Sequence, residues 1–107
     1  MAKLISIYWR DIPAQVVGRS GRKNGFKKEL EPRFATAIDR AAMRAGRGSS
    51  DAYLEDWRRV SEDVDGDLEA LVNARVAELE GQFDDASLEA LVKAGGSIEE
   101  AEKRAKG

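Results

Sequence analysis

The residue types that most often carry catalysis are missing from this chain. None of its 107 residues is cysteine or histidine. This excludes disulfides, thiolate nucleophiles, zinc or haem sites built on these side chains, and the usual general base near neutral pH. A catalytic site would have to use carboxylates, Lys, Arg, Tyr or Ser without histidine support, which is uncommon. We therefore expect no catalytic residues, no metal site and no cofactor, and a protein that works by binding a partner.

A basic, glycine-rich segment is the first candidate for such binding. Residues Gly18 to Gly25 read GRSGRKNG, and their amides together with Arg19, Arg22 and Lys23 could surround an anion. The segment lacks the G-x-x-x-x-G-K-[ST] and G-x-G-x-x-G patterns of nucleotide sites. We expect a charged, flexible hairpin loop, and a contact with a partner or a phosphate stays open.

The distribution of charge argues against a nucleic-acid partner. Residues 1–59 carry 13 Lys or Arg and 7 Asp or Glu, a net charge of +6, whereas residues 60–107 carry 5 and 13, a net charge of −8. The basic half continues through Lys27 and Lys28 to Arg33. The pI of about 5.3 nevertheless lies far below that of a typical nucleic-acid-binding domain.

An acidic run from Asp63 to Asp67, followed by Glu69, has the carboxylate density of a calcium loop. Its register is wrong for an EF-hand, because Gly66 precedes the third acidic position and no glutamate closes a twelve-residue loop. Capping of a helix by Asp65 or Asp67 is the better interpretation.

Four aromatic side chains stand in two groups, Tyr8 with Trp9 and Tyr53 with Trp57. We expect one member of each group in the core. An exposed Trp9 or Trp57 would be an interface anchor, since Trp and Arg often dominate binding energy. The predicted partner-binding residues combine these tryptophans with nearby arginines and the basic loop: Trp9, Arg10, Arg19, Arg22, Lys23, Trp57 and Arg58.

The elements that must position these residues begin with strands. Residues 3–9 are rich in β-branched and aromatic types, which predicts a strand. Asp11, Ile12 and Pro13 interrupt the chain after it, because proline cannot donate to a strand ladder. Residues 14–17 and 26–30 predict a second and a third strand, joined by the basic loop.

Helical periodicity begins at Pro32. A stripe of apolar residues predicts a helix over about 32–45, containing Phe34, Ala37, Ile38, Ala41, Ala42 and Ala45. Ser49 or Ser50 can cap a short second helix in which Leu54 and Trp57 point inward. After the connector SEDVDGD, a third helix runs to about residue 82, and Asp84 or Asp85 caps a fourth. Ser97 and Glu100 have capping-box spacing and open a last, polar helix.

These elements predict an α+β fold with about three N-terminal antiparallel strands packed against about four helices. We expect one domain over residues 1–96, with residues 97–107 as a loosely docked helix or tail. The apolar N-terminal run is broken by Ser6, Arg10 and Asp11 before it reaches the length of a signal peptide or a membrane span. We therefore expect a cytoplasmic protein without membrane contact, and a homo-oligomer stays open.

Two segments, MAKLISIYWRDIPAQVVGRSGRKN and AIDRAAMRAGRGSSDAYLEDWRR, resemble a family of small bacterial proteins called virulence factor, which is similar to the C-terminal part of conserved virulence factor C. The resemblance covers residues 1–60 and, more loosely, 77–96. It implies an accessory role beside folate- or corrinoid-dependent one-carbon enzymes. A non-catalytic protein that binds a larger partner is the first hypothesis, and a small cofactor- or substrate-binding subunit of such an enzyme is the alternative.

Overall fold

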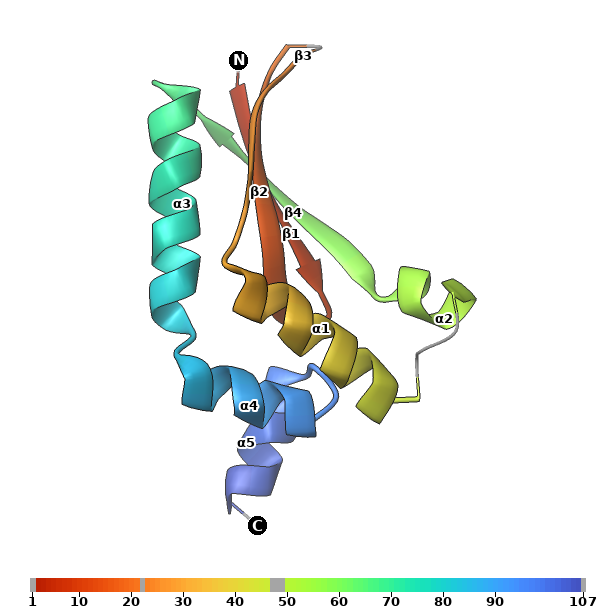
Figure 1. The fold of residues 1–107 in the computed structure, drawn as a ribbon. Helices are drawn as coiled ribbons and strands as arrows, with labels where there is room; N and C mark the ends of the chain where they lie inside the picture. Colours follow the sequence, from red (N-terminus) through yellow and green to blue (C-terminus); the bar gives the residue numbers. More distant parts are fainter. Residues whose placement is uncertain (1, 22, 47–49, 107) are drawn as a thin grey trace.

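A computed structural model describes residues 2–21, 23–46 and 50–106 (Figure 1). Four strands form one antiparallel sheet in the order β3-β2-β1-β4: β1 (Ala2–Trp9), β2 (Ile12–Ser20), β3 (Lys23–Glu29) and β4 (Trp57–Val64). The helices are α1 (Pro32–Arg44), α2 (Ser50–Glu55), α3 (Leu68–Gln82), α4 (Asp85–Lys93) and α5 (Ile98–Lys106). The predicted α+β class is confirmed, with one strand more than expected.

The extra strand is β4, which corrects the prediction for residues 57–64. We expected the short second helix to include Trp57 and a polar connector to begin at Ser61. The helix instead ends at Glu55, and Trp57 begins a strand that pairs along β1. The sequence pattern hid this strand because its residues 58–63 are exposed on both faces, so apolar and polar residues do not alternate.

The basic segment also differs from the prediction. β2 continues to Ser20 and β3 begins at Lys23, so the expected eight-residue loop is largely ladder, and Gly21 turns the chain with a φ of 59°. Arg22 lies outside the described residues. The strand ladder occupies backbone groups that a flexible loop would have offered to an anion.

The helices α1, α3 and α4 place their predicted apolar stripes in the core, whereas Leu54 of α2, which we expected to point inward, is 64% exposed. Phe34, Ile38 and three alanines of α1 are buried, as are Val72, Val76 and Leu79 of α3. Asp67 caps α3 by accepting hydrogen bonds from the backbone N–H groups of Glu69 and Ala70, which confirms the capping interpretation of the acidic run. Asp84 caps α4 in the same way, through the N–H of Ser87.

The helix α3 covers one face of the sheet, across β3, β2 and β1 (Figure 1). Its side chains meet Gly18 and Ser6, because a Cβ on Gly18 would lie 2.8 Å from Val72 Cγ2 and Arg75 donates to the Ser6 hydroxyl. Alternation along β1 and β2 then places Ile5, Ile7, Gln15 and Val17 on the opposite face, which we call the second face. Ile5 is 9% exposed, and the other three are half-buried.

A clasp joins the end of β1 to the start of α5. The Asp11 N–H donates to the carbonyl oxygen of Gly96 at 3.0 Å, and its carboxylate accepts from the Ile98 N–H at 2.7 Å. Gly96 has a φ of 94°, and a Cβ there would lie 2.9 Å from the ring of Trp9. Any side chain at position 96 would therefore be strained twice, by its backbone and by the tryptophan.

Candidate functional site

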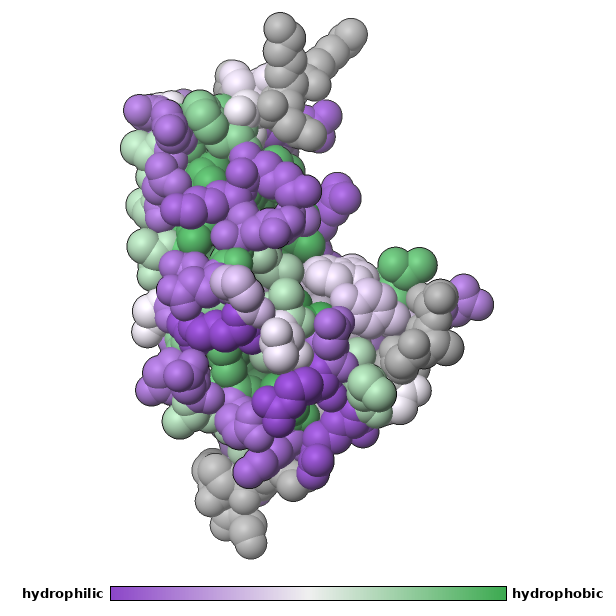
Figure 2. Space-filling model, viewed as in Figure 1, coloured by the Kyte–Doolittle hydropathy of each residue, from purple (hydrophilic) through white to green (hydrophobic). Residues whose placement is uncertain are grey.

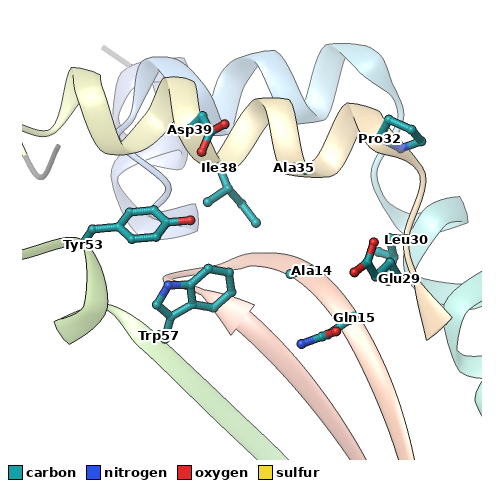
Figure 3. Close-up of a pocket in the computed structure, with 10 residues that line it drawn as sticks. All are labelled: Ala14, Gln15, Glu29, Leu30, Pro32, Ala35, Ile38, Asp39, Tyr53 and Trp57. Atoms are coloured by element: carbon teal, nitrogen blue, oxygen red, sulfur yellow. The ribbon is translucent and has the colours of Figure 1, made fainter. Parts of the chain in front are cut away.

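A pocket lies where α1, α2 and the ends of the strands meet (Figure 3). It has a volume of about 380 Å³. Its walls are largely apolar, with four polar side chains among them. The lining consists of Ala14, Leu30, Pro32, Ala35, Ile38 and Trp57 with Gln15, Glu29, Asp39 and Tyr53.

Aromatic packing fixes one wall of this pocket. The Tyr53 ring stacks on Trp9 with centroids 5.9 Å apart, and it meets the edge of Trp57 at 5.7 Å. Trp9 Nε1 also donates to the Tyr53 carbonyl oxygen at 2.9 Å. The short helix α2 is thereby held against the end of the sheet, and Figure 3 shows the Tyr53 hydroxyl pointing into the pocket toward Ile38.

The polar groups of the pocket favour a positively charged or hydrogen-bond-donating guest. Glu29 and Asp39 supply carboxylates, and none of the described lining residues carries a positive charge. Burial, with a contribution from the charge of Asp39, raises the pKa of the Tyr53 phenol above its ordinary value of 10.0. The hydroxyl therefore stays protonated at neutral pH and can donate a hydrogen bond.

The second face leads into the pocket. Gln15 lies opposite Ile7 and Glu29, so the row that carries Ile7 continues directly to the pocket wall. Its far end carries the exposed residues Lys3 and Arg19, of which Lys3 forms an ion pair with Asp63 at 3.6 Å, and Lys27 lies one row inward, opposite Val17. A strip of half-buried apolar side chains thus runs from a basic end at the β2–β3 hairpin to an acidic end at α1.

Two of the predicted partner-binding residues serve the fold directly. Trp9 is 0% exposed, and its ring belongs to the core. Arg10 has a φ of 53° and is held at both ends: its N–H donates to the Asp56 carbonyl oxygen, and its guanidinium binds the Gly95 carbonyl oxygen and the Asp56 carboxylate. Their side chains therefore organise the corner between β1 and β4.

Arg58 and Trp57 lie nearer the surface. Arg58 donates to the Arg10 carbonyl oxygen and to Asp11, and it covers the Tyr8 ring at 4.8 Å. Trp57 is half-buried and lines the pocket, so it is the predicted tryptophan that a guest could touch.

The predicted hairpin residues lie at the opposite end of the sheet. Arg19 is exposed at the end of β2. The backbone of Lys23 pairs with Ser20, and Arg22 falls outside the described residues. The structure therefore separates this basic group from Trp57 and the pocket.

Sequence reasoning missed Gln15, Glu29 and Asp39. These residues lie on three elements and look like ordinary solvent-facing positions in each. The acidic charge of Asp39, outside the buried alanine stripe of α1, was the one visible feature, but it gave no sign of a site because only the tertiary fold brings Asp39 near Tyr53. No three acidic side chains among the described residues are grouped so that they could hold a metal ion.

Comparisons with known proteins give one result. The family described as "Virulence factor" matches residues 7–92. Neither a curated protein nor a solved structure matches the chain. Within the described residues, no helix has the length and apolar character to cross a membrane. The family match includes β2, β3, α1–α3, β4, all of α4 except its last residue, and every residue that lines the pocket, so the chain belongs to the virulence factor family.

Proposed function

We propose that this chain is a cytoplasmic, non-catalytic accessory protein that binds a larger protein partner. The observation that carries this proposal is the pocket beside Tyr53 and Trp57, which combines apolar walls with the carboxylates of Glu29 and Asp39. A Lys or Arg side chain of a partner fits this chemistry, because its aliphatic stem can pack on Trp57 while its charge meets the carboxylates.

The strip beside the pocket supports a protein guest over a small one. Ile5, Ile7 and Val17 supply an apolar centre, and charges of opposite sign stand at the two ends of the strip. An arrangement of this kind fixes the orientation of a partner segment, since complementary charges give specificity and steer association. The exposed Arg19 keeps its predicted role here, as a contact for an acidic group of the partner.

The same pocket is the basis of the alternative, a small cofactor- or substrate-binding subunit. Its volume of about 380 Å³ falls within the range of roughly 300–1,000 Å³ that is usual for small-molecule sites. Folates and nucleotides are anions, however, and two carboxylates with no cation among the described lining residues repel them. A neutral or cationic ligand is the form of this alternative that the pocket favours.

The proposal is tested by isosteric removal of charge. The tagged protein is used to capture partners from its native cytoplasm, and each candidate is then purified and its affinity measured by calorimetry. The folate- and corrinoid-dependent one-carbon enzymes that the family resemblance implies are examined first. Glu29→Gln with Asp39→Asn should weaken binding by about tenfold or more, because both lost charges face the guest.

The matched control is Glu99→Gln with Glu102→Gln, which removes two exposed carboxylates from α5. This variant should bind the partner like the wild type. Equal affinity of the pocket variant and the control would overturn the proposal. Stabilisation of the free protein by a small cation or neutral compound, lost in the pocket variant, would favour the alternative instead.

A further inference from the structure

The strand β4 forms a free edge of the sheet. It is eight residues long, it pairs with β1, and it ends the order β3-β2-β1-β4. Residues 58–63 are exposed, including Val60, which has 44% of its surface exposed. An edge of this length presents unpaired backbone groups that can pair with another strand.

Hydrogen bonds elsewhere in the sheet show which residues present those groups. The Arg10 N–H donates to the Asp56 carbonyl oxygen, and these two residues continue the pairing in which Tyr8 lies opposite Arg58. Hydrogen-bonded pairs alternate along an antiparallel ladder, so residues 58, 60 and 62 point their backbone groups toward β1. Trp57, Arg59, Ser61 and Asp63 therefore point theirs toward the free edge.

Charge divides β4 into two halves. Arg58 and Arg59 precede the centre of the strand, and Glu62 and Asp63 follow it. A second copy of the same strand, running antiparallel, brings its acidic half beside the basic half of the first copy. A single-signed edge would repel such a copy, so this strand is complementary to itself.

We propose that two copies of the chain pair through β4 to form a symmetric dimer with one continuous eight-stranded sheet. The two-fold axis passes beside Val60, so Val60 faces the second copy's Val60. Arg58 then faces the second copy's Glu62, and Glu62 faces the second copy's Arg58. Arg59 and Ser61 form the hydrogen-bonded pairs on either side of the axis.

The neighbouring registers are worse on physical grounds. In an antiparallel pair, a residue whose backbone groups point toward the free edge must face another residue of that kind. The two-fold axis can therefore pass beside a residue but not between two neighbours, and the alternatives nearest to Val60 place it beside residue 59, 61 or 62. At Arg59 or Glu62 it would set two like charges against each other. At Ser61 it would set Val60 against the second copy's Glu62. The Ser61 register would also set Arg59 against the second copy's Asp63, but only the register centred on Val60 matches apolar with apolar as well as basic with acidic.

Charges already paired within each chain extend this match. Arg75 forms an ion pair with Glu62, and Arg58 forms one with Asp11 at 3.1 Å. In the dimer these pairs join into an alternating row, Arg75–Glu62 of one copy and then Arg58–Asp11 of the second copy. Networks of alternating charge contribute more than isolated surface pairs, and salt weakens them.

The first measurement is sedimentation velocity over a range of protein concentrations at low and high salt. Edge pairing buries less surface than a standard interface, so we expect a dimer with micromolar affinity that weakens at high salt. A monomer at every concentration would overturn the proposal. Growth beyond the dimer would also overturn it, because it would indicate open-ended pairing of β4 with β3.

A charge exchange at the axis tests the register. Val60→Lys and Val60→Glu should each lose the dimer, because two like charges would meet at the axis, and an equal mixture of the two variants should recover it as a heterodimer. Circular dichroism checks that both variants fold, which the exposure of Val60 favours. Stronger self-association of Val60→Lys would overturn the register, since it would place residue 60 opposite Glu62.

A backbone substitution supplies an independent test. Ser61→Pro removes an N–H that faces the free edge, so it should abolish the dimer while leaving the ladder with β1 intact. The matched variant Val60→Pro removes an N–H that faces β1 and should destabilise the monomer itself. Retention of the dimer by a folded Ser61→Pro variant would contradict pairing through β4.

Discussion

Gly18 is the point where the sheet and α3 approach most closely, and replacing it by alanine tests this packing. An added Cβ would lie 2.8 Å from Val72 Cγ2 and 3.4 Å from Leu68 Cδ2. Val72 is 2% exposed, and a valine in a helix has essentially one χ1 rotamer, so its methyl group cannot rotate away. The helix as a whole must shift, or the contact must stay compressed.

The expected cost follows from two opposing effects. Overpacking of a core contact costs about 1–3 kcal/mol. Alanine recovers about 0.5–1 kcal/mol because glycine loses more conformational freedom when a strand folds. Gly18→Ala should therefore lower the free energy of unfolding by about 1–2 kcal/mol. For a domain of this size, that corresponds to a fall in Tm of roughly 4–16 °C.

Urea unfolding measures this loss and a double-mutant cycle locates its cause. Val72→Ala alone leaves a cavity and should cost about 2 kcal/mol or more. In the double variant the clash is gone, so the total cost should fall below the sum of the single costs by about 1 kcal/mol. Gly25→Ala is the matched control, since its Cβ would meet only the mobile end of Leu68 among side chains, at 3.3 Å. Strictly additive costs, or a larger effect at Gly25, would refute the reasoning.

Three further predictions concern the helices and their ends. Gly81→Ala should raise the free energy of unfolding by about 0.5–1 kcal/mol, because a Cβ there meets nothing within 4 Å and α3 gains helix propensity; unchanged urea unfolding would contradict this. Arg33→Lys should cost about 1–2 kcal/mol in the same assay, since lysine cannot reproduce the fork that binds the carbonyl oxygens of Glu80 and Phe83; equal stability would show that the fork is dispensable. The hydrogen bond from the Ser87 N–H lowers the pKa of Asp84 below its ordinary 3.8, so its contribution is present above that pH and is lost as the pH falls through the folded-state pKa. Asp84→Asn should therefore flatten the acid limb of the stability curve measured by thermal melting, and parallel curves would argue against this cap.

The helices α1, α3 and α4 were predictable because each buries one periodic stripe. Phe34 and Ile38 recur at helical spacing, and the same positions are buried in α1. Local chemistry also fixed the starts of two helices, where Asp84 and Ser97 accept hydrogen bonds from backbone N–H groups three residues later. Signals of this kind depend only on neighbouring residues, so one sequence suffices to find them.

The strand β4 and the pocket depend on distant residues and escaped prediction for that reason. Arg58 and Glu62 in an edge strand can face solvent on either side, which removes the alternation that marks a strand. Asp39 and Glu29 are exposed charges, and only the approach of α1 to β3 brings them to one pocket. Arg10 resembled an interface residue, whereas the fold supplies its guanidinium with partners inside the chain.

The clasp between Asp11 and the start of α5 has a consequence for synthesis of the protein. Asp11 leaves the ribosome 87 residues before Ile98, whose N–H binds its carboxylate, and α1–α4 are made in between. Until Gly96 has been made, the ring of Trp9 at the end of β1 therefore lacks this part of its cover. A nascent chain stalled before residue 96 should expose this tryptophan to chaperones, and synthesis and release of residues 96–98 should bury it.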